Sequence, residues 1–496
     1  MSVDRIIGAL AARAPDAPVL IGDTESLSAS ALLGAIEALA LRLGGCRTLA
    51  VLADNGPAWV VADLAALRAG VTHVPLPTFF NPSQLTHVLN ETCADTVLTD
   101  QPERIAALGL GLDFAGQWSG LAWMQRAPLA RTMPAGTGKV SFTSGSTGTP
   151  KGVCLSAAGL MDTAVAVTTR LADLPIGRHL ATLPLALLLE NTAGLYAPLL
   201  RDAEIHVPSL RALGWKGMAG FDPAALQTIA RAVRPSSTIL VPELLKAWTL
   251  HLAATGQKAP SGLAYVAVGG ARVDAGAIRK ARALGLPAYQ GYGLTECGSV
   301  VSLNRPGDDC DDVGRPLDHV RVRARGGEIL VSARAFLGYL GAADAAPPIG
   351  ATPDFPTGDL GHVDAHGHLH LVGRRRNLLI TSYGRNVSPE WVEVGLLAQP
   401  AIAQAVVAGE ARPWLSAVIV PAPGARPEAI AAAVARANAA LPEYARIGDW
   451  VTAAPFTLEN GEATGNGRPV RQAILARYAA PLEALYSTRY ASHAVL

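Results

Sequence analysis

The chain has 496 residues, which is too long for one hydrophobic core and predicts at least two domains. Hydrophobic residues make up 50% of it and charged residues 16%, so a large buried interior is easily supplied. The net charge of +1 gives no basic field for nucleic acid. Five cysteines are scattered without CxxC spacing, which argues against a disulfide framework or a zinc site and favours a reducing cytoplasm.

The first 18 residues predict an amphipathic helix rather than a signal peptide, because Asp4 and Arg5 stand where a signal peptide has a basic start and an apolar run. The most apolar later stretch, residues 180–200, is interrupted by two prolines, a glutamate and an asparagine. We therefore expect no membrane span.

Short apolar runs alternate with helical patterns along the first part of the chain. This rhythm predicts an α/β fold in which parallel sheets are covered by helices. The expected strands are residues 48–52, 71–75, 96–98, 237–241, 263–268 and 288–292, and the first two flank an expected helix at residues 59–69.

The segment FTSGSTGTPKG, residues 142–152, concentrates groups that bind phosphate. Its glycines free the backbone, its serines and threonines supply donors, and Lys151 supplies a point charge. It is not a Walker A loop, because Pro150 precedes the lysine and Gly152 follows it. The apolar runs on either side predict a hairpin, whereas the alternative is a flexible Gly/Ser linker.

The segment resembles the phosphate loop of the adenylate-forming superfamily, which includes acyl-CoA synthetases, aryl-CoA ligases, luciferases and peptide-synthetase adenylation domains. The resemblance extends over essentially the whole chain. It implies that ATP phosphates contact Lys151 and a set of loop residues: Thr143, Ser144, Gly145, Ser146, Thr147 and Gly148.

The heptad QGYGLTE, residues 290–296, follows an expected strand and so stands where open α/β folds bind ligands. The resemblance implies that Tyr292, between Gly291 and Gly293, stacks on adenine, that Thr295 contacts the α-phosphate and that Glu296 helps to hold Mg²⁺. Upstream, Gly269, Gly270 and Ala271 end another apolar strand and match the family's glycine pair that lines the adenine and acyl pockets. Taken alone, the heptad is also compatible with an ordinary turn.

The segment TGDLG, residues 357–361, is interpreted as a tight turn whose Asp359 accepts both ribose hydroxyls. By resemblance, Arg374 also contacts the nucleotide and Arg376 is the hinge residue. The alternative is a turn former followed by a solvated run of arginines.

A domain boundary is expected near residues 373–377, after a hairpin at 361–372 that itself follows a loop at about 342–356. We predict an N-terminal ATP- and acyl-binding domain at 1–374 and a mobile C-terminal α+β domain at 375–496.

In TSYGRNVSPEWVE, residues 381–393, Gly384 matches a family loop beside the tunnel for the thiol, where a side chain would block the approach of the thiol. The alternative is that this segment is an ordinary turn without a functional role.

Arg468 marks a departure from the family. The segment FTLENGEATGNGR, residues 456–468, keeps the frame of a motif that ends in a catalytic lysine, but it ends in arginine. That lysine bridges the attacking carboxylate and the α-phosphate, so the bulkier, planar guanidinium predicts weakened adenylation.

The run LPLALLLENTAG, residues 183–194, resembles part of the acyl pocket of long-chain fatty acyl-CoA synthetases, with Leu187 where these carry histidine. An apolar wall suits a hydrocarbon chain, although most of the leucines also fit a plain core. The expected activity is ATP- and Mg²⁺-dependent conversion of a fatty acid to an acyl adenylate and then to a CoA thioester. Transfer to carrier-protein phosphopantetheine, an aryl or cyclic acid, and a degenerate adenylation protein remain alternatives, and chain length, oligomeric state and pathway stay open.

Overall fold

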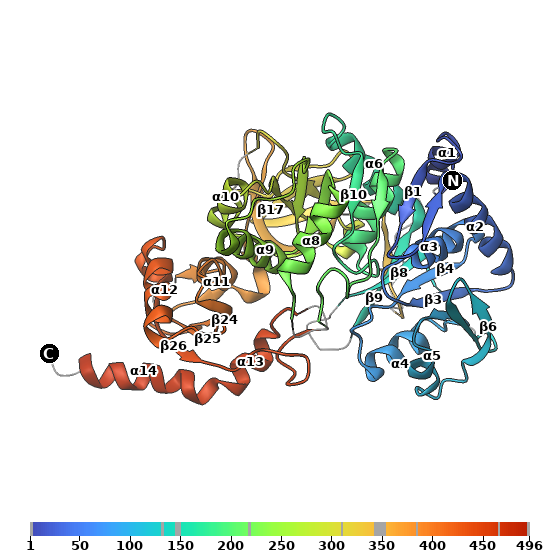
Figure 1. The fold of residues 1–496 in the computed structure, drawn as a ribbon. Coiled ribbons are helices and arrows are strands. Elements are labelled where there is room, and N and C mark those ends of the chain that lie inside the picture. Colours follow the sequence, from blue (N-terminus) through green and yellow to red (C-terminus); the bar gives the residue numbers. More distant parts are fainter. Residues whose placement is uncertain are drawn as a thin grey trace.

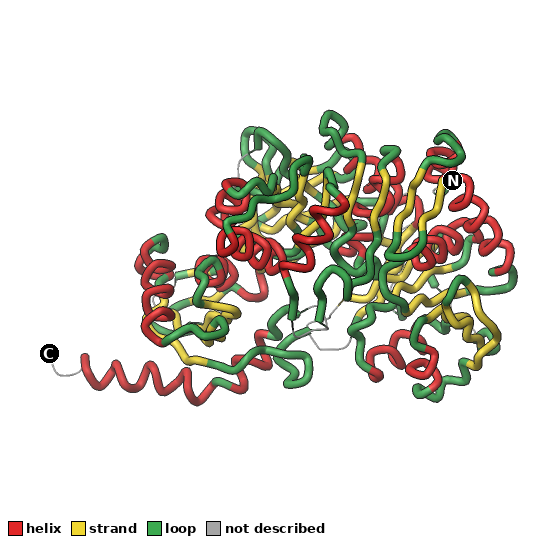
Figure 2. Tube along the Cα trace, in the orientation of Figure 1, coloured by secondary structure: helices red, strands yellow, loops and turns green. Residues whose placement is uncertain are grey.

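The computed structural model describes residues 3–129, 133–143, 150–216, 220–308, 311–341, 354–382, 385–464 and 467–493. It has a large N-terminal domain of sheets and helices and a smaller C-terminal domain (Figure 1). The last helix packs against the sheet of the smaller domain. Figure 2 shows the helices packed around the outside of the strands in the larger domain.

An eight-stranded sheet carries the phosphate-loop segment. Its four central strands run parallel, whereas the two strands on either side of them are antiparallel to their neighbours. In sheet order the strands are β19 (Phe336–Tyr339), β9 (Lys151–Ser156), β8 (Thr137–Thr143), β4 (Thr72–Pro75), β3 (Thr48–Leu52), β5 (Thr96–Thr99), β7 (Leu121–Gln125) and β6 (Asp113–Trp118). The predicted hairpin at the phosphate loop is confirmed as the β8–β9 pair.

A nine-stranded sheet carries the QGYGLTE segment at one end. Its strands, in order, are β16 (Arg315–Pro316), β15 (Ser302–Leu303), β14 (Ala288–Tyr292), β13 (Tyr265–Val268), β12 (Ser237–Leu240), β10 (Arg178–Leu180), β11 (Glu204–His206), β1 (Pro18–Ile21) and β2 (Ser26–Ser28). The strands from β14 to β1 are parallel. Both sheets contain the parallel strands that the sequence predicted, and hairpins add antiparallel strands at their edges.

Helices join and cover these strands. In the larger domain they are α1 (Asp4–Ala11), α2 (Ala29–Arg42), α3 (Pro57–Ala69), α4 (Pro82–Glu91), α5 (Pro102–Ala106), α6 (Ala157–Arg170), α7 (Ala197–Leu200), α8 (Pro223–Val233), α9 (Pro242–Thr255) and α10 (Ala275–Ala283). The predicted helices at the N-terminus and at residues 59–69 are confirmed as α1 and α3. Helix α3 begins at Pro57, and the residue after its last turn is Gly70, whose left-handed φ of 70° favours glycine.

A four-stranded antiparallel sheet of β17 (Arg321–Arg325), β18 (Glu328–Ser332), β20 (Phe355–Val363) and β21 (Leu369–Arg374) completes the larger domain. The predicted hairpin at 361–372 is confirmed as the β20–β21 pair, with Asp364 accepting hydrogen bonds at its turn. Most of the loop expected at 342–356 lies outside the described residues.

The smaller domain packs a three-stranded sheet of β24 (Ile402–Ala408), β25 (Leu415–Pro421) and β26 (Ile447–Thr452) against helices. The other elements are η3 (Arg375–Asn377), β22 (Leu379–Ile380), β23 (Asn386–Val387), α11 (Pro389–Leu397), α12 (Pro427–Ala439), η4 (Glu443–Ala445), α13 (Arg471–Arg477) and α14 (Ala479–His493). Two apolar clusters in this part of the chain contain only residues from 379 onward. We propose the boundary at 374/375 on this ground.

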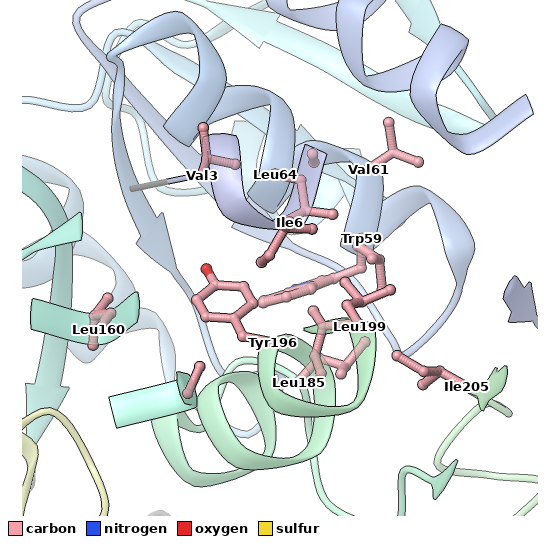
Figure 3. Packing of buried hydrophobic residues seen from close by; sticks show 14 of the residues in the cluster. Val3, Ile6, Trp59, Val61, Leu64, Leu160, Leu185, Tyr196, Leu199 and Ile205 are labelled. Carbon is pink, nitrogen blue, oxygen red and sulfur yellow. The ribbon is translucent and has the colours of Figure 1, made fainter. Parts of the chain in front are cut away.

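The core of the larger domain encloses a fully buried ionic network. Lys139, on β8, is 0% exposed, and its Nζ donates to Asp63 Oδ1 at 2.7 Å and to Tyr196 Oη at 2.9 Å. Burial raises the pKa of Asp63, but the charges of Lys139 and His73 outweigh it and leave that pKa below its usual value. Figure 3 shows Tyr196 packed among Ile6, Trp59 and other apolar side chains. The network therefore ties the strand that leads into the phosphate loop to the surrounding helices.

No helix among the described residues has the length and apolar character that a membrane crossing needs.

Candidate active site

A cavity of about 2640 Å³ is lined by residues of both domains. All of the predicted site residues that lie in the described ranges line it: Thr143, Lys151, Gly270, Ala271, Gly291, Tyr292, Gly293, Thr295, Glu296, Asp359, Arg374, Arg376 and Arg468. Ser144, Gly145, Ser146, Thr147, Gly148 and Gly384 lie outside the described residues. Segments that are far apart in the sequence therefore meet at one place, while the role of each residue stays a prediction.

At one side of the cavity, Asp359 joins two other predicted nucleotide contacts. Its Oδ2 accepts a hydrogen bond from the Tyr292 hydroxyl at 2.5 Å, and its Oδ1 lies 2.8 Å from Arg374 Nε. Burial raises the pKa of Asp359, and Arg374 opposes this shift. The aromatic ring, the carboxylate and the guanidinium form a cluster that suits a base and a ribose.

The prediction that Asp359 lies on a tight turn is wrong. Thr357–Gly361 lies inside strand β20, where Asp359 is paired with Arg374 of β21. The register of β18 against β20 shifts between Glu328 and Leu330, and Gly358 has a φ of 72°. The glycine therefore forms a bulge in a continuous strand, where the sequence had suggested a turn. The bulge leaves Asp359 aimed into the cavity.

Two glycines let the backbone close tightly around the cavity. Gly293, directly after β14, has no room for a side chain, because a Cβ there would lie 1.6 Å from the carbonyl oxygen of Ser299. Gly270, just after β13, has a left-handed φ of 86°. The two strand ends thus bring Tyr292 and the Gly270 carbonyl to the cavity wall, as expected at the carboxyl edge of a parallel sheet.

Lys151 and Glu296 are linked by Tyr339 of β19, which sequence reasoning did not identify. Thr143 and Lys151 face each other across β8 and β9, at the two ends of the phosphate-loop segment. The ammonium of Lys151 lies 5.6 Å from the centre of the Tyr339 ring, and the Tyr339 hydroxyl donates to Glu296 Oε1 at 2.9 Å. One aromatic side chain thus touches both charged groups.

The donor set fits magnesium bound together with a phosphate-bearing substrate. The described residues contain no group of three or more His, Cys, Asp or Glu side chains able to hold a metal. Magnesium, however, is commonly bound through one or two carboxylates together with substrate phosphates and water. Glu296, a carboxylate on the short helix η2 (Thr295–Cys297), satisfies that requirement beside Thr295 and near Lys151.

Arg468 reaches into the cavity from the C-terminal domain. Its Nη2 donates to the carbonyl oxygen of Gly270, so the two domains touch at the site. Desolvation lowers the pKa of Arg468, the like charge of Arg374 adds to this, and Glu243 opposes it. Arg376 lies in η3, the single turn between the last strand of the larger domain and the first strand of the smaller one.

Part of the cavity lining is apolar and includes a residue of the π-helix η1 (Glu190–Tyr196). Glu190 is fully buried, and its Oε1 lies 3.0 Å from His179 Nε2 while its Oε2 accepts from the Leu183 amide at 3.0 Å. Leu187 and Ala193 line the cavity. Glu190 is therefore a structural anchor for the apolar wall, and sequence reasoning did not find its partner His179.

The family model described as AMP-binding enzyme matches residues 9–329, and the model described as AMP-binding enzyme C-terminal domain matches residues 376–490. The first match alone covers more than half of the chain. The second begins within the short helix that carries Arg376.

Individual relatives differ in the acids for which they are named. The chain is 33% identical to a long-chain-fatty-acid–CoA ligase of Mycobacterium bovis over 44% of this chain, but the match spans only 41% of that relative's length. It is 29% identical to a feruloyl-CoA synthase of Amycolatopsis sp over 78% of this chain and 81% of the relative. Among solved structures, o-succinylbenzoate CoA synthetase of Bacillus subtilis with its acyl-adenylate intermediate matches with a TM-score of 0.76 and 22% identity, over 94% of this chain and 97% of that one.

Proposed function

The chain belongs to the AMP-binding enzyme family, and from this premise we propose that it activates a carboxylic acid with ATP and then transfers the acyl group to a thiol. The observation that carries the proposal is the convergence of Lys151, Glu296, Asp359 and Arg468 on one cavity between the two domains. We further propose CoA as the thiol and the cytoplasm as the location, the latter because the cysteine pattern suits a reducing compartment.

In the first half-reaction the carboxylate attacks the α-phosphorus of ATP, and pyrophosphate leaves as the acyl adenylate forms. Asp359 and Tyr292 hold the ribose and the base, and Lys151 offsets charge on the departing pyrophosphate. Thr295 donates to the α-phosphate, and Arg468 approaches it from the other domain. Magnesium, which Glu296 would hold, supplies further neutralisation of the phosphate charge.

In the second half-reaction a thiol attacks the acyl carbonyl and AMP leaves. We propose that the C-terminal domain first turns about Arg376, which withdraws Arg468 and brings the segment of Gly384 to the cavity. Neither half-reaction requires a covalent enzyme intermediate, so no nucleophilic cysteine is needed.

A fatty acid is the substrate class that we favour. Besides Leu187 and Ala193, the cavity is lined by Val167 of α6, by Leu171, which directly follows that helix, and by Ala197 of α7. A wall of this kind excludes water from a hydrocarbon chain. The feruloyl-CoA synthase relative supports an aryl acid as the second candidate.

The test is to incubate the purified protein with ATP, Mg²⁺ and a panel of acids of graded chain length together with aryl acids, with and without CoA. Mass spectrometry then measures adenylate and thioester, and a coupled assay measures pyrophosphate. We expect acid-dependent pyrophosphate release, an aliphatic preference and a thioester only when CoA is present. Release with aryl acids alone would favour the second candidate, and the absence of both products for every acid would contradict the proposal.

A further inference from the structure

Lys246 of helix α9 crosses from the N-terminal domain to the end of a helix in the C-terminal domain. Its Nζ donates to the carbonyl oxygens of Leu397 at 2.6 Å, Gln399 at 3.3 Å and Ile402 at 2.8 Å. These carbonyls end helix α11 and lead into β24. An ammonium group has three N–H donors, so all of them are used.

This contact brings a cation to the backbone carbonyl oxygens at the end of α11, a helix with no basic residue in its own last turn. The last carbonyls of a helix have no partner within the helix, and that end carries partial negative charge. Lys246 therefore caps α11 from the opposite domain, and the cap exists only while the two domains are docked as they are here.

Lys246 is not an ordinary solvated lysine. It follows Leu244 and Leu245 and precedes Trp248, all buried in the core of its own domain. Burial lowers the pKa of Lys246 to about 8, and the nearby Glu243 on the same helix raises it. Three carbonyl oxygens surround the half-buried ammonium group and offset the cost of removing it from water.

The same docking brings Arg468 to the active site. The carboxylate of Glu243, which lines the cavity, raises the pKa of both Lys246 and Arg468. The two cations that contact the opposite domain therefore lie near the same carboxylate. Lys246 donates to backbone carbonyl oxygens at the end of α11, and Arg468 donates to the Gly270 carbonyl oxygen in the cavity.

We propose that Lys246 is a positioning residue for the first half-reaction, which holds the C-terminal domain in the orientation that places Arg468 in the site. The inference rests on the proposed function, in which thioester formation requires a different orientation of that domain. The cap must then break between the half-reactions. Loss of Lys246 should slow adenylate formation and leave the transfer to thiol intact.

The experiment compares the wild type with Lys246→Met, which removes the ammonium but keeps the length, and Lys246→Arg, which keeps a cationic donor. Lys280→Met, an exposed position on α10, is the matched control. Three quantities are measured: acid-dependent pyrophosphate exchange, thioester formation from supplied acyl adenylate, and the rate of tryptic cleavage at the exposed Arg375–Arg376 pair.

For Lys246→Met we expect exchange to fall by about tenfold, as is typical when charge-assisted hydrogen bonds are lost, and hinge cleavage to accelerate by a similar factor. Thioester formation from supplied adenylate should stay within about twofold of wild type. Lys246→Arg should recover most of the exchange rate, and Lys280→Met should match wild type throughout.

Equal losses in both half-reactions, or unchanged hinge cleavage in Lys246→Met, would overturn the inference. If the wild type releases no pyrophosphate with any acid, the proposed function fails instead. The cleavage comparison is independent of catalysis and still decides whether Lys246 holds the domains together.

Discussion

Arg468 has the positive charge expected of the residue that reaches the α-phosphate. Its guanidinium group is planar and wide, however, so its N–H donors point in other directions than those of a lysine ammonium group. In the structure it donates to the Gly270 carbonyl oxygen. We expect Arg468→Lys to raise the rate of acid-dependent pyrophosphate release by about three- to tenfold, because a compact ammonium can follow the phosphate oxygens.

Arg426→Lys is the control for this prediction, because Arg426 is an exposed arginine in the same domain, at the start of α12. It should leave the release rate unchanged. A rate for Arg468→Lys equal to that of wild type would show that the arginine does not weaken adenylation.

Tyr339 touches two charged groups of the site, so its hydroxyl and its ring can be tested separately. Tyr339→Phe removes the hydrogen bond to Glu296 and keeps the ring beside Lys151. Because the carboxylate loses an orienting partner, we expect the Mg²⁺ concentration for half-maximal pyrophosphate release to rise by about three- to tenfold, with little change at saturation.

Tyr339→Leu additionally removes the ring, and the loss of the cation–π contact should raise the KM for ATP as well. Tyr444→Phe, at an exposed tyrosine of the C-terminal domain, serves as the control. An unchanged Mg²⁺ dependence in Tyr339→Phe would refute the orienting role of the hydroxyl.

At the scale of elements, the π-helix η1 connects the apolar wall to the rigid core. Ala193 lines the cavity from this helix, and its neighbour Gly194 is packed so closely that a Cβ there would lie 2.0 Å from Glu190 Oε1. The wall therefore has little freedom to retreat when a residue that faces the cavity is enlarged.

We expect Ala193→Phe to shorten the accepted acid. The ring would fill space that the distal part of a chain needs, so kcat/KM for a long-chain acid should fall by at least about tenfold, while that for a short acid changes much less. Rates on the graded acid panel measure the change. Ala254→Phe, on the exposed face of α9, should not alter the profile. A uniform loss for all acids would place the acyl chain elsewhere.

The secondary-structure elements that carry the site residues could be predicted from the sequence only in part. Tyr292 ends β14, the strand in which the sequence placed it. The sequence placed Lys151 in the loop of the hairpin, and the structure makes it the first residue of β9. Asp359 was predicted as a site residue but on the wrong element, because Gly358 favours a turn and a bulge equally well. Local composition does not distinguish these two structures.

At the scale of the whole molecule, the alternation of strands and helices can be predicted from the sequence, but the contacts between distant segments cannot. Tyr339 lies 43 positions from Glu296, and Lys246 lies 151 positions from Leu397. No periodic pattern in the sequence indicates either of these contacts. A lysine within the apolar stretch LLKAWTL is the one local irregularity that marks Lys246, because a charge there needs a partner.

Stability of the whole molecule should depend on His319, which joins the loop before β17 to α6 through a 3.0 Å contact between its Nε2 and Thr163 Oγ1. Burial lowers the pKa of His319 to about 4, although Asp162 and Asp318 oppose this shift. An unfolded histidine has an ordinary pKa of about 6.5, so between pH 6.5 and 4 the unfolded chain takes up a proton that the folded chain resists. This group therefore disfavours folding progressively as the pH falls through that window.

From these two pKa values, His319 should cost about 2 kcal/mol of folding free energy at pH 5 relative to pH 7.5. Urea unfolding followed by tryptophan fluorescence at both pH values measures the loss. His319→Gln removes the titrating group, so its loss of stability between the two pH values should be smaller than that of wild type by about this amount. His366→Gln, at the exposed turn of the β20–β21 hairpin, should lose as much as wild type. Equal losses in His319→Gln and wild type would mean that His319 is protonated without cost in the folded protein, and that acid destabilisation arises elsewhere.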